Sequence, residues 1–433
     1  MKEERIVIWG AGYIGLTTAI AFAEVGRKTI IYDVDLNKIN RINKGVNPIH
    51  NLDYWCGYCF NPWFENQIIK SSLYKNVFWG NINFIAVPTQ NKMEPCYDAL
   101  EDVLKKIINI SITSNNRPII IIESTLSPGT VDQFILPMLQ KKLGENNFVL
   151  CIAPRRDWFI SVDKTLKTLP RVYSCIGEEN RKTIEKILGL ICDHLIYSCD
   201  YRVAEAVKSI ENVFRYVDIS IANQLALAFP DLDVEEILKL AGTKWNIDTY
   251  SPSFGIGGYC VPLAAEYLMN SLFKKTDLSI IRSAIEFNNQ YTEILLSAIS
   301  IKKFKKIGIL GLAYKNDIRV ADGSPTLGLV TAIKNRYKLE VYVNDPYYTD
   351  DEIVKLTNSH PFKFPQELSE FDCVLLVTAH RDYSFIGNNK IVDSLQKNAV
   401  IIDGTGIWEQ CLKNSTKVKY IRIGRKNWYS DKR

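Results

Sequence analysis

The sequence contains no long apolar run, and none of its hydrophobic stretches approaches the ~18 residues that a membrane-spanning helix needs. The net charge is only +5 over 433 residues, which favours neither a nucleic-acid-binding nor a membrane-surface protein. Met1–Arg5 pass directly into the apolar Ile6–Trp9, without the layout of a signal peptide. We therefore expect a cytoplasmic protein that has neither a nucleic acid nor a membrane as its partner.

Metal-binding cysteine patterns are also scarce. The ten cysteines are scattered, as thiols in a reducing compartment are. Cys56 and Cys59 form a Cys-x-x-Cys pair, but no second pair stands at zinc spacing. This pair falls within residues 46–76, which are rich in aromatic residues and Asn and have little periodicity. We interpret that stretch as an irregular insert with two ordinary thiols and predict no metal site.

The remaining composition is that of an ordinary globular protein, with 47% hydrophobic and 23% charged residues. A chain of 433 residues is too long for one ordinary domain. We therefore expect two or three domains with large cores.

A glycine-rich turn follows the first predicted strand, Arg5–Trp9. The turn reads Gly10-Ala11-Gly12-Tyr13-Ile14-Gly15 and leads into a predicted helix over Leu16–Val25. In such a turn the first glycine allows the tight bend, the second lets a pyrophosphate approach, and the third lets the helix pack closely. The helix N-terminus then faces the phosphates.

An acidic residue completes this pattern. The next predicted strand, Lys28–Tyr32, ends in Asp33, which would accept hydrogen bonds from ribose hydroxyls and favour NAD over NADP. The alternative is a purely structural glycine turn. The strand, the helix and the acid together favour an NAD-binding domain.

Further strands are predicted over 82–87, 119–123 and 149–153, with a helix over 98–110 between the first two. This alternation predicts a parallel, doubly wound sheet. Ligands bind such sheets at the carboxyl ends of the strands. The residues expected at these ends are Pro88, Thr89, Ser124, Thr125, Pro154, Arg155 and Arg156.

The composition changes near Asp200, where a long amphipathic helix is predicted over Arg202–Ala228. Its polar stripe carries Lys208, Asn212 and Arg215 at helical spacing. Its apolar residues recur with the same period: Val207, Ile210, Phe214, Val217, Ile221 and Leu225. A helix this long that links two domains also predicts a subunit interface, and hence a homodimer through the central helices.

Three glycines crowd into the stretch Ser253–Cys260, at positions 255, 257 and 258. Glycine lets backbone amides come close to a ligand. Cys260 at the end of this loop would be able to attack a carbonyl carbon. The alternative is a buried thiol after a flexible turn.

Strand–helix alternation resumes after a second helical stretch, Ile280–Ile299. Strands are predicted over 307–311, 341–345, 373–378 and 400–403, without a clean glycine fingerprint. We therefore predict an α/β protein of two Rossmann-like, doubly wound domains, 1–199 and 300–433, joined by a central long-helix domain, 200–299.

Several segments together resemble the UDP-sugar 6-dehydrogenase family, over nearly the whole chain. The most specific is Phe254–Cys260, which resembles the family's catalytic-cysteine motif. Ala204–Arg215 is similar to the version in UDP-N-acetylmannosamine and UDP-N-acetylglucosamine dehydrogenases. The other similar segments are Gly10–Leu16, Ala86–Thr89, Glu123–Thr130, Gly311–Lys315, Asp345-Pro346 and Asp403–Gly406.

The resemblance implies NAD-dependent oxidation of the C6 alcohol of a UDP-hexose or UDP-N-acetylhexosamine to a uronic acid, in polysaccharide biosynthesis. Cys260 would add to the intermediate aldehyde as a thiohemiacetal, and oxidation would leave a thioester for water to hydrolyse. Lys208 and Asn212 would hold the reacting oxygens, and Thr125 the water.

The predicted site residues fall into two further sets. The cofactor-binding residues are Gly10, Gly12, Tyr13, Ile14, Gly15, Asp33, Pro88, Thr89 and Ser124. The substrate-binding residues are Arg155, Arg156, Lys208, Asn212, Phe254, Gly255, Gly257, Gly258 and Lys315.

Three positions depart from the family pattern. Arg155 and Ala264 stand where the family has acids that position or activate water, and Asp322 stands where it has an Arg. One interpretation is drift with the same product. The other is a changed outcome, such as release of the aldehyde, an unusual substrate, or transfer of the thioester to another nucleophile. Arg155 beside Arg156 would suit an additional negative charge on the substrate, or face solvent or a phosphate.

Two other functions remain open at this point. A 6-phosphogluconate-type hydroxyacid dehydrogenase shares the opening domain and the long helix, but needs neither the Cys260 loop nor a second Rossmann unit. A non-catalytic protein that binds NAD or nucleotide-sugars would explain the missing acids.

Overall fold

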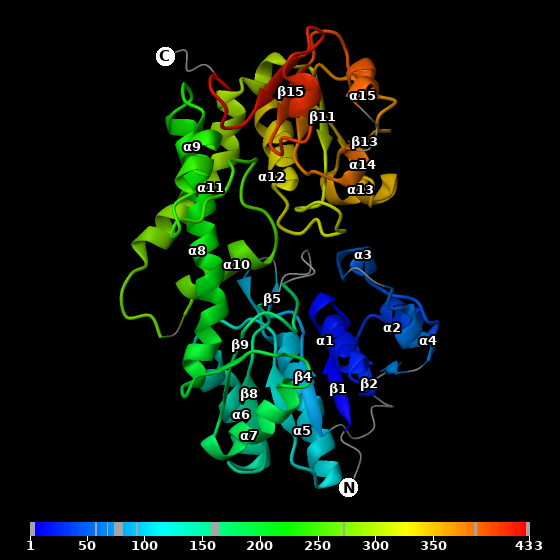
Figure 1. Ribbon diagram of the computed structural model, residues 1–433, viewed down its shortest axis with the longest axis vertical. Coiled ribbons are helices and arrows are strands. Elements are labelled where there is room, and N and C mark those ends of the chain that lie inside the picture. Colours follow the sequence, from blue (N-terminus) through cyan, green and yellow to red (C-terminus); the bar gives the residue numbers. More distant parts are fainter. Residues whose placement is uncertain are drawn as a thin grey trace. The chain divides into compact units, whose positions relative to one another are not determined.

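The computed structural model describes residues 5–56, 59–66, 68–72, 81–91, 94–156, 164–271, 273–384 and 388–429 (Figure 1). The chain forms two compact units. Unit 1 comprises Met1–Glu211 and Glu266–Asp277, and unit 2 comprises Asn212–Ala265 and Leu278–Arg433. The three-domain division of the sequence stays a prediction, because the central helices are shared between these two units.

Unit 1 is built on an eight-stranded sheet of order β10-β9-β8-β7-β4-β1-β2-β3. All pairs are parallel except β8 with β9. The strands are β1 (Ile6–Trp9), β2 (Thr29–Tyr32), β3 (Ile69–Ser72), β4 (Ile82–Ile85), β7 (Ile119–Ile122), β8 (Val149–Ile152), β9 (Arg171–Cys175) and β10 (Leu195–Tyr197). A separate hairpin pairs β5 (Gln90–Asn91) with β6 (Glu94–Pro95).

Both faces of this sheet are covered, because alternate side chains of each strand enter different cores. Ile6 and Ile8 enter one core, with α1 (Tyr13–Glu24) and α7 (Arg181–Leu188). Val7 and Trp9 enter the other, with α5 (Asp98–Ser114) and α6 (Leu136–Leu143). The predicted doubly wound α/β sheet is confirmed, and α1 packs along β1 and β2 (Figure 1).

The stretch 46–76 is more regular than predicted. After α2 (Leu36–Asn43) it contains α3 (Leu52–Cys56), α4 (Asn61–Glu65) and β3, which pairs with β2 and extends the sheet. The pairing partner supplies order that local periodicity does not show. Neither Cys56 nor Cys59 takes part in a disulfide, and the described part of the chain holds no cluster of three metal-ligating side chains. Residues 57, 58, 67 and 73–76 lie outside the described residues.

Unit 2 contains a six-stranded, fully parallel sheet of order β13-β12-β11-β14-β15-β16. The strands are β11 (Lys306–Leu310), β12 (Glu340–Asn344), β13 (His360–Pro361), β14 (Cys373–Leu376), β15 (Val400–Asp403) and β16 (Lys419–Arg422). One core takes α11 (Ser279–Ala298), α12 (Pro325–Ala332) and α13 (Asp350–Thr357). The other takes α14 (Arg381–Ser384), α15 (Asn388–Ser394) and α16 (Glu409–Leu412). This sheet confirms the second predicted Rossmann-like unit.

The long helix α8 spans Tyr201–Ala228, close to its predicted bounds. Its buried side is made by small or polar-tipped residues: Ala204, Ser209, Val213, Tyr216 and Ala226. Much of the predicted apolar stripe is exposed, with Phe214 at 68% and Ile221 at 47%. The other central helices are α9 (Val234–Ala241) and α10 (Cys260–Met269). No helix in the described ranges is long and apolar enough to cross a membrane.

Candidate active site

In unit 1 the strand order reverses between β1 and β4, so the loops that follow these strands meet at one edge of the sheet. Gly10 follows β1, and its amide donates to the Tyr32 carbonyl at 2.7 Å. Its φ is +107°, and an added Cβ would lie 2.4 Å from the Ala86 carbonyl oxygen. Glycine is therefore required where the turn meets the loop after β4.

Gly12 and Gly15 have opposite surroundings. A Cβ at Gly15 would lie 1.8 Å from the Gly10 carbonyl oxygen, whereas no described atom lies within 4 Å of the Cβ position at Gly12. Gly12 is also the N-cap of α1, whose first turn contains Tyr13 and Ile14. Since the N-cap has no side chain to occupy the first amides, this open end of α1 fits a dinucleotide pyrophosphate.

Asp33 holds the glycine turn from β2. Its carboxylate accepts the amide of Ala11 at 2.6 Å and that of Asp35 at 2.8 Å, with Lys38 Nζ 3.7 Å away. A carboxylate has about four acceptor sites. Asp33 thus keeps free acceptor capacity, and its contact with the ribose hydroxyls of NAD stays a prediction.

Two hydroxyls tie the loop after β4 to the loop after β7. Ser124 Oγ donates to the Val87 carbonyl and Thr89 Oγ1 to the Thr125 carbonyl, both at 2.7 Å. Thr89 Oγ1 also lies 2.7 Å from Tyr267 Oη. Thus Pro88, Thr89, Ser124 and Thr125 do lie together at one edge of the sheet, and their roles toward ligands stay predictions.

Arg155 does not face solvent but makes hydrogen bonds within unit 1, and its predicted contact with a substrate stays a prediction. Its side chain is 2% exposed, and its guanidinium donates to the Ile14 carbonyl and to the hydroxyls of Thr17 and Thr18. The carboxylate of Glu123 lies 3.8 Å away. The first turns of α1 and this acid supply the polar partners that a buried cation needs.

Glu123 is the centre of that buried cluster. Its carboxylate pairs with Arg171 at 2.6 Å and accepts Thr18 Oγ1 at 2.7 Å. The cluster joins α1, the end of β7 and the start of β9, close to the glycine turn that follows β1. Sequence reasoning missed Arg171, because it stands at the start of a strand that the local pattern did not predict.

The start of α8 contributes further polar groups to unit 1. Arg156 donates to Glu211 and, at 2.8 Å, to the Pro170 carbonyl, so this arginine too has protein partners. Glu205 accepts the amides of Gly129 and Val131 at 2.8 and 2.9 Å, and burial raises the pKa of this carboxyl to about 7. Lys208 lies one turn later and is half-buried.

In unit 2, helix α10 begins at Cys260, whose side chain is exposed. Asn212 is buried, and its Nδ2 donates to the Cys260 carbonyl at 3.3 Å. The amide of Ser253 donates to Asn223 at 2.9 Å, and Tyr291 Oη donates to the Ser253 carbonyl at 2.7 Å. The cysteine loop is therefore held at both ends.

The glycines of this loop are required by the segment that packs on it. The φ of Gly258 is +92°, and its amide donates to the Gly323 carbonyl at 3.0 Å. A Cβ at Gly258 would lie 2.5 Å from the Tyr314 ring, and one at Gly257 would lie 2.6 Å from Pro325. Gly255, with φ +133°, shares this need for a left-handed backbone.

The side chain of Phe254 is buried, and its predicted contact with the substrate stays a prediction. Its side chain is 1% exposed and packs in the core, where a Cβ at Gly404 would lie 2.4 Å from the ring. A buried phenylalanine anchors the loop by its apolar area. Only its backbone remains for a substrate.

Lys315 directly follows Tyr314 and is half-buried. Burial, and after it the positive charge of Arg215, lower its pKa to about 8, while Cys260 acts in the opposite direction. Arg215 itself donates to Tyr250 Oη at 3.3 Å. Lys315 therefore stands within electrostatic range of both the exposed thiol and a second cation, Arg215, and such groups of cations are typical of sites for anionic ligands.

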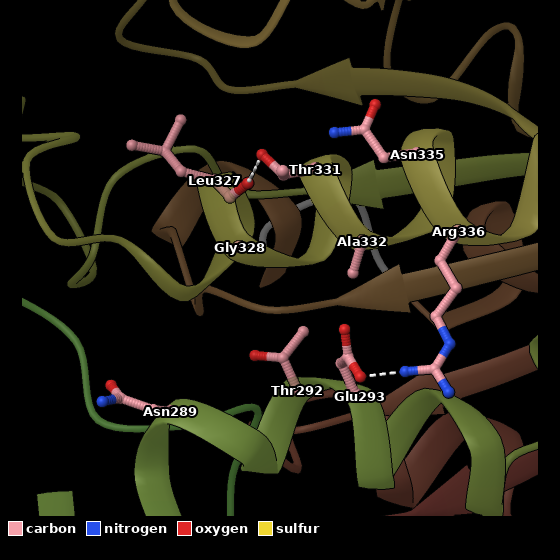
Figure 2. Close-up of a pocket in the computed structure, with 9 residues that line it drawn as sticks. All are labelled: Asn289, Thr292, Glu293, Leu327, Gly328, Thr331, Ala332, Asn335 and Arg336. Carbon is pink, nitrogen blue, oxygen red and sulfur yellow. Dashed lines mark hydrogen bonds and ion pairs between the residues drawn. The ribbon is translucent and has the colours of Figure 1, made fainter. Parts of the chain in front are cut away.

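Figure 2 shows a separate groove of unit 2, about 580 Å³ in volume, between α11 and the segment that begins with α12. Six of its nine lining residues are polar, and Glu293 pairs with Arg336 across it. The lining residues are Asn289, Thr292, Glu293, Leu327, Gly328, Thr331, Ala332, Asn335 and Arg336. Neither Cys260 nor any other predicted site residue lines this groove.

Three family models match successive parts of the chain. They are the NAD binding domain of the UDP-glucose/GDP-mannose dehydrogenase family over residues 4–190, its central domain over 202–290 and its UDP binding domain over 308–410. The chain belongs to the UDP-glucose/GDP-mannose dehydrogenase family. It is thus an NAD-dependent oxidoreductase of that family, and the 6-phosphogluconate-type alternative is wrong.

Individual members of the family are distant but similar over their full length. The UDP-N-acetyl-D-mannosamine dehydrogenase of Pyrococcus horikoshii is 27% identical over 93% of this chain and 96% of its own. The UDP-N-acetyl-D-glucosamine 6-dehydrogenase of Salmonella typhi is 24% identical over 90% and 93%. The solved structure of the UDP-D-ManNAc dehydrogenase from Pyrococcus horikoshii has a TM-score of 0.82 at 26% identity, covering 98% of this chain and 100% of that chain.

Proposed function

We propose that the protein oxidises the C6 alcohol of a UDP-N-acetylhexosamine to the uronic acid, with Cys260 as the nucleophile. The observation that carries this proposal is an exposed thiol at the start of α10, held through Asn212 and accompanied by Lys315 and Arg215. The names of the relatives, UDP-N-acetyl-D-mannosamine and UDP-N-acetyl-D-glucosamine dehydrogenases, support an N-acetylated sugar.

The cysteine performs the covalent part of the reaction. When bound, NAD accepts the hydrides that oxidation of an alcohol to an acid releases. The Cys260 sulfur forms a C–S bond to the aldehyde carbon, and the former carbonyl oxygen takes a proton. Oxidation of this thiohemiacetal leaves a thioester. Water then forms the new C–O bond as the C–S bond breaks and the thiol is restored.

The neighbouring groups favour each stage of this chemistry. The positive end of α10 favours an anionic sulfur. Lys315 and Arg215 would pair with the phosphates of the nucleotide, and Lys208 with a developing oxyanion. Gly12 and the first turn of α1 would hold the NAD pyrophosphate, and Asp33 its ribose.

We further propose that hydrolysis of the thioester is the slow stage. Arg155 and Ala264, which the resemblance of the sequence motifs places where the family has acids, are both buried, and Arg155 is already bonded to α1. General acid–base assistance is worth about 10²–10⁴-fold per group. Free acid would therefore form slowly after rapid thioester formation.

We propose in addition a homodimer through the central helices. The exposed apolar residues of this region in unit 2 include Phe214, Ile221, Leu240 and Trp245, and Trp245 is 92% exposed. Such a concentration of exposed apolar side chains is typical of a subunit interface. Sedimentation of the wild type against Phe214→Asp and Leu240→Asp tests it, with a dimer expected only for the wild type.

The function is tested by incubating the purified protein with NAD and separate UDP-sugars while NADH and the product mass are followed. With a UDP-N-acetylhexosamine we expect two NADH per sugar, a rapid NADH phase before a slower one, and the mass of the acid. Equal amounts of NADH and aldehyde would contradict acid formation. NAD and nucleotide-sugar binding without any NADH would instead identify a non-catalytic binding protein.

A further inference from the structure

A buried histidine lies beside the loop that carries Lys315. His380 follows β14, at the edge of the unit 2 sheet where the strand order reverses between β11 and β14. It is 0% exposed, and the proposed reaction does not use it. No sequence pattern points to it, because an isolated histidine after a strand has no diagnostic spacing.

Both ring nitrogens of His380 make hydrogen bonds within unit 2. The amide of Asp317 donates to Nδ1 at 2.9 Å, and Nε2 lies 3.0 Å from Asp345 Oδ2. Because the Asp317 amide needs an acceptor, Nδ1 carries no proton in this arrangement. Nε2 then carries the proton and donates to Asp345. The rings of Tyr347 and Tyr383 pack edge-on against the imidazole and fix its orientation.

These two bonds fall on opposite sides of Lys315 in the chain. Asp345 Oδ2 accepts the amides of Leu312 and Ala313 at 2.7 and 2.8 Å, and His380 accepts that of Asp317. A single imidazole therefore joins both ends of the loop 311–317. We propose that His380 is a positioning residue that fixes this loop and so keeps Lys315 in its half-buried place near Cys260, where the lysine would take a phosphate of the nucleotide-sugar. Only the identity of the ligand rests on the proposed function.

The charged surroundings make this contact sensitive to acid. Burial lowers the pKa of His380, but hydrogen bonds to Asp317 and Asp345 outweigh that effect, and the pKa is raised overall. Protonation places a hydrogen on Nδ1, so the Asp317 amide loses its acceptor, while Asp317 Oδ1 lies 3.8 Å from Nδ1 as a new partner. Arg381 pairs with the same carboxylate at 3.0 Å. Acid should therefore loosen the loop 311–317.

Two substitutions of His380 each keep only one of its two hydrogen-bonding groups. His380→Asn keeps an acceptor near the position of Nδ1, and His380→Gln keeps a donor near that of Nε2. We expect either variant to raise the KM for the UDP-sugar about three- to tenfold, with a smaller change in kcat and an unchanged KM for NAD. The rise in KM that acid causes in the wild type should be absent from both. His360→Asn, at an exposed histidine of the same unit, is the matched control and should behave as the wild type.

A second readout does not depend on turnover. Pulse acetylation of lysines over a pH series, read by mass spectrometry, should show Lys315 reacting around its pKa of about 8 in the wild type. In the His380 variants the pH midpoint of Lys315 labelling should move up towards the ordinary lysine pKa of 10.5, because the side chain of a lysine on a released loop is hydrated. Folded His380 variants with unchanged Lys315 labelling and unchanged KM would overturn the proposal, whereas a merely structural role would lower only the melting temperature.

The wild type provides a test if neither variant folds. Amide hydrogen exchange of residues 311–317 should be faster at about pH 5.5 than at about pH 7.5, after correction for intrinsic rates. Equal protection at the two pH values would overturn the proposal. If no UDP-sugar is oxidised by the wild type, the labelling and exchange results still decide the role of His380, and the proposed function fails separately.

Discussion

The two units build the same turn in different ways. In unit 1 the amide of Gly10 donates to the Tyr32 carbonyl at 2.7 Å, and Asp33 accepts the amide of Ala11. In unit 2 the amide of Gly311 donates to the Asn344 carbonyl at 2.9 Å, and an acid at the same place, Asp345, accepts the next two amides. Gly10 and Gly311 also share a φ near +100°.

The two units differ in the segment that leads from this turn to the next helix. In unit 1 helix α1 starts at Tyr13, directly after the side-chain-free Gly12, and no described atom lies within 4 Å of a Cβ built at Gly12. In unit 2 residues 312–324 intervene before α12, whose first turn is capped by Ser324. We therefore expect unit 1 to bind an anion at a helix N-terminus, and unit 2 to bind one through the side chain of Lys315. A Rossmann-like turn does not by itself require the glycine fingerprint.

The largest expected effect comes from replacing the proposed nucleophile in unit 2, a change that leaves unit 1 intact. Cys260→Ser should lower uronic acid formation at least about 10³-fold, because an alcohol oxygen is a poor substitute for a thiolate. NAD affinity, measured by titration calorimetry, should not change. Cys199→Ser, at an exposed thiol of unit 1, is the control and should keep full activity. Wild-type rates in Cys260→Ser would contradict the proposed nucleophile.

A methyl group added at Gly15 in unit 1 or at Gly311 in unit 2 should destabilise the protein for the same reason. A Cβ at Gly15 would lie 1.8 Å from a backbone oxygen, and one at Gly311 would lie 2.4 Å from Thr378, so neither Gly15→Ala nor Gly311→Ala can be accommodated without movement. Each should destabilise its unit by about 1–3 kcal/mol, seen as a lower melting temperature. Gly328→Ala, where the nearest atom is at 3.6 Å, is the tolerated control. Unchanged melting of both variants would contradict the close packing.

Gly12 should separate stability from binding. Gly12→Ala meets no described atom within 4 Å, so its melting temperature should stay within about 1 °C of the wild type. Its dissociation constant for NAD should rise about tenfold, because the methyl group would occupy the space of the pyrophosphate. An unchanged affinity for NAD would show that this open space serves another purpose.

The smallest effect concerns the charge of Lys315. Its ammonium form predominates below its pKa of about 8 and is lost above it. The KM for the UDP-sugar should therefore rise by up to about tenfold between pH 8 and pH 9, while the KM for NAD stays flat. Lys315→Arg keeps its charge in this range and should remove the dependence. A KM rise that persists in Lys315→Arg would assign the titration to another group.

Local signals predicted the parts of the fold that local forces decide. The apolar run Ile6–Trp9 and the turn Gly10–Gly15 identified the first sheet, and the alternation after Lys306 identified the second. Strand β3 was missed, because its order comes from pairing with β2 rather than from its own periodicity. The observed ends of several helices and strands differ by a few residues from the predicted ends, because tertiary contacts decide where an element stops.

The candidate site was predictable only where residue type and motif coincide. Cys260 and Asn212 do meet in unit 2, as their motifs suggested. The burial of Arg155 could not be foreseen, because its partners Thr18 and Glu123 lie 137 and 32 residues away in the chain. The contacts of Phe254 with Gly404 and of His380 with Asp317 also join residues that are distant in sequence, and no spacing rule predicts them.

The packing of Phe254 on Gly404, and of Gly258 on Tyr314 and Gly323, has a practical consequence for engineering. Three stretches of the chain, 253–260, 311–325 and 403–406, fit one another with no room for a methyl group at several glycines. A chimera that takes only one of them from a relative would combine surfaces that were never matched. A stretch taken from a relative therefore fits only if all three are exchanged together as one cassette.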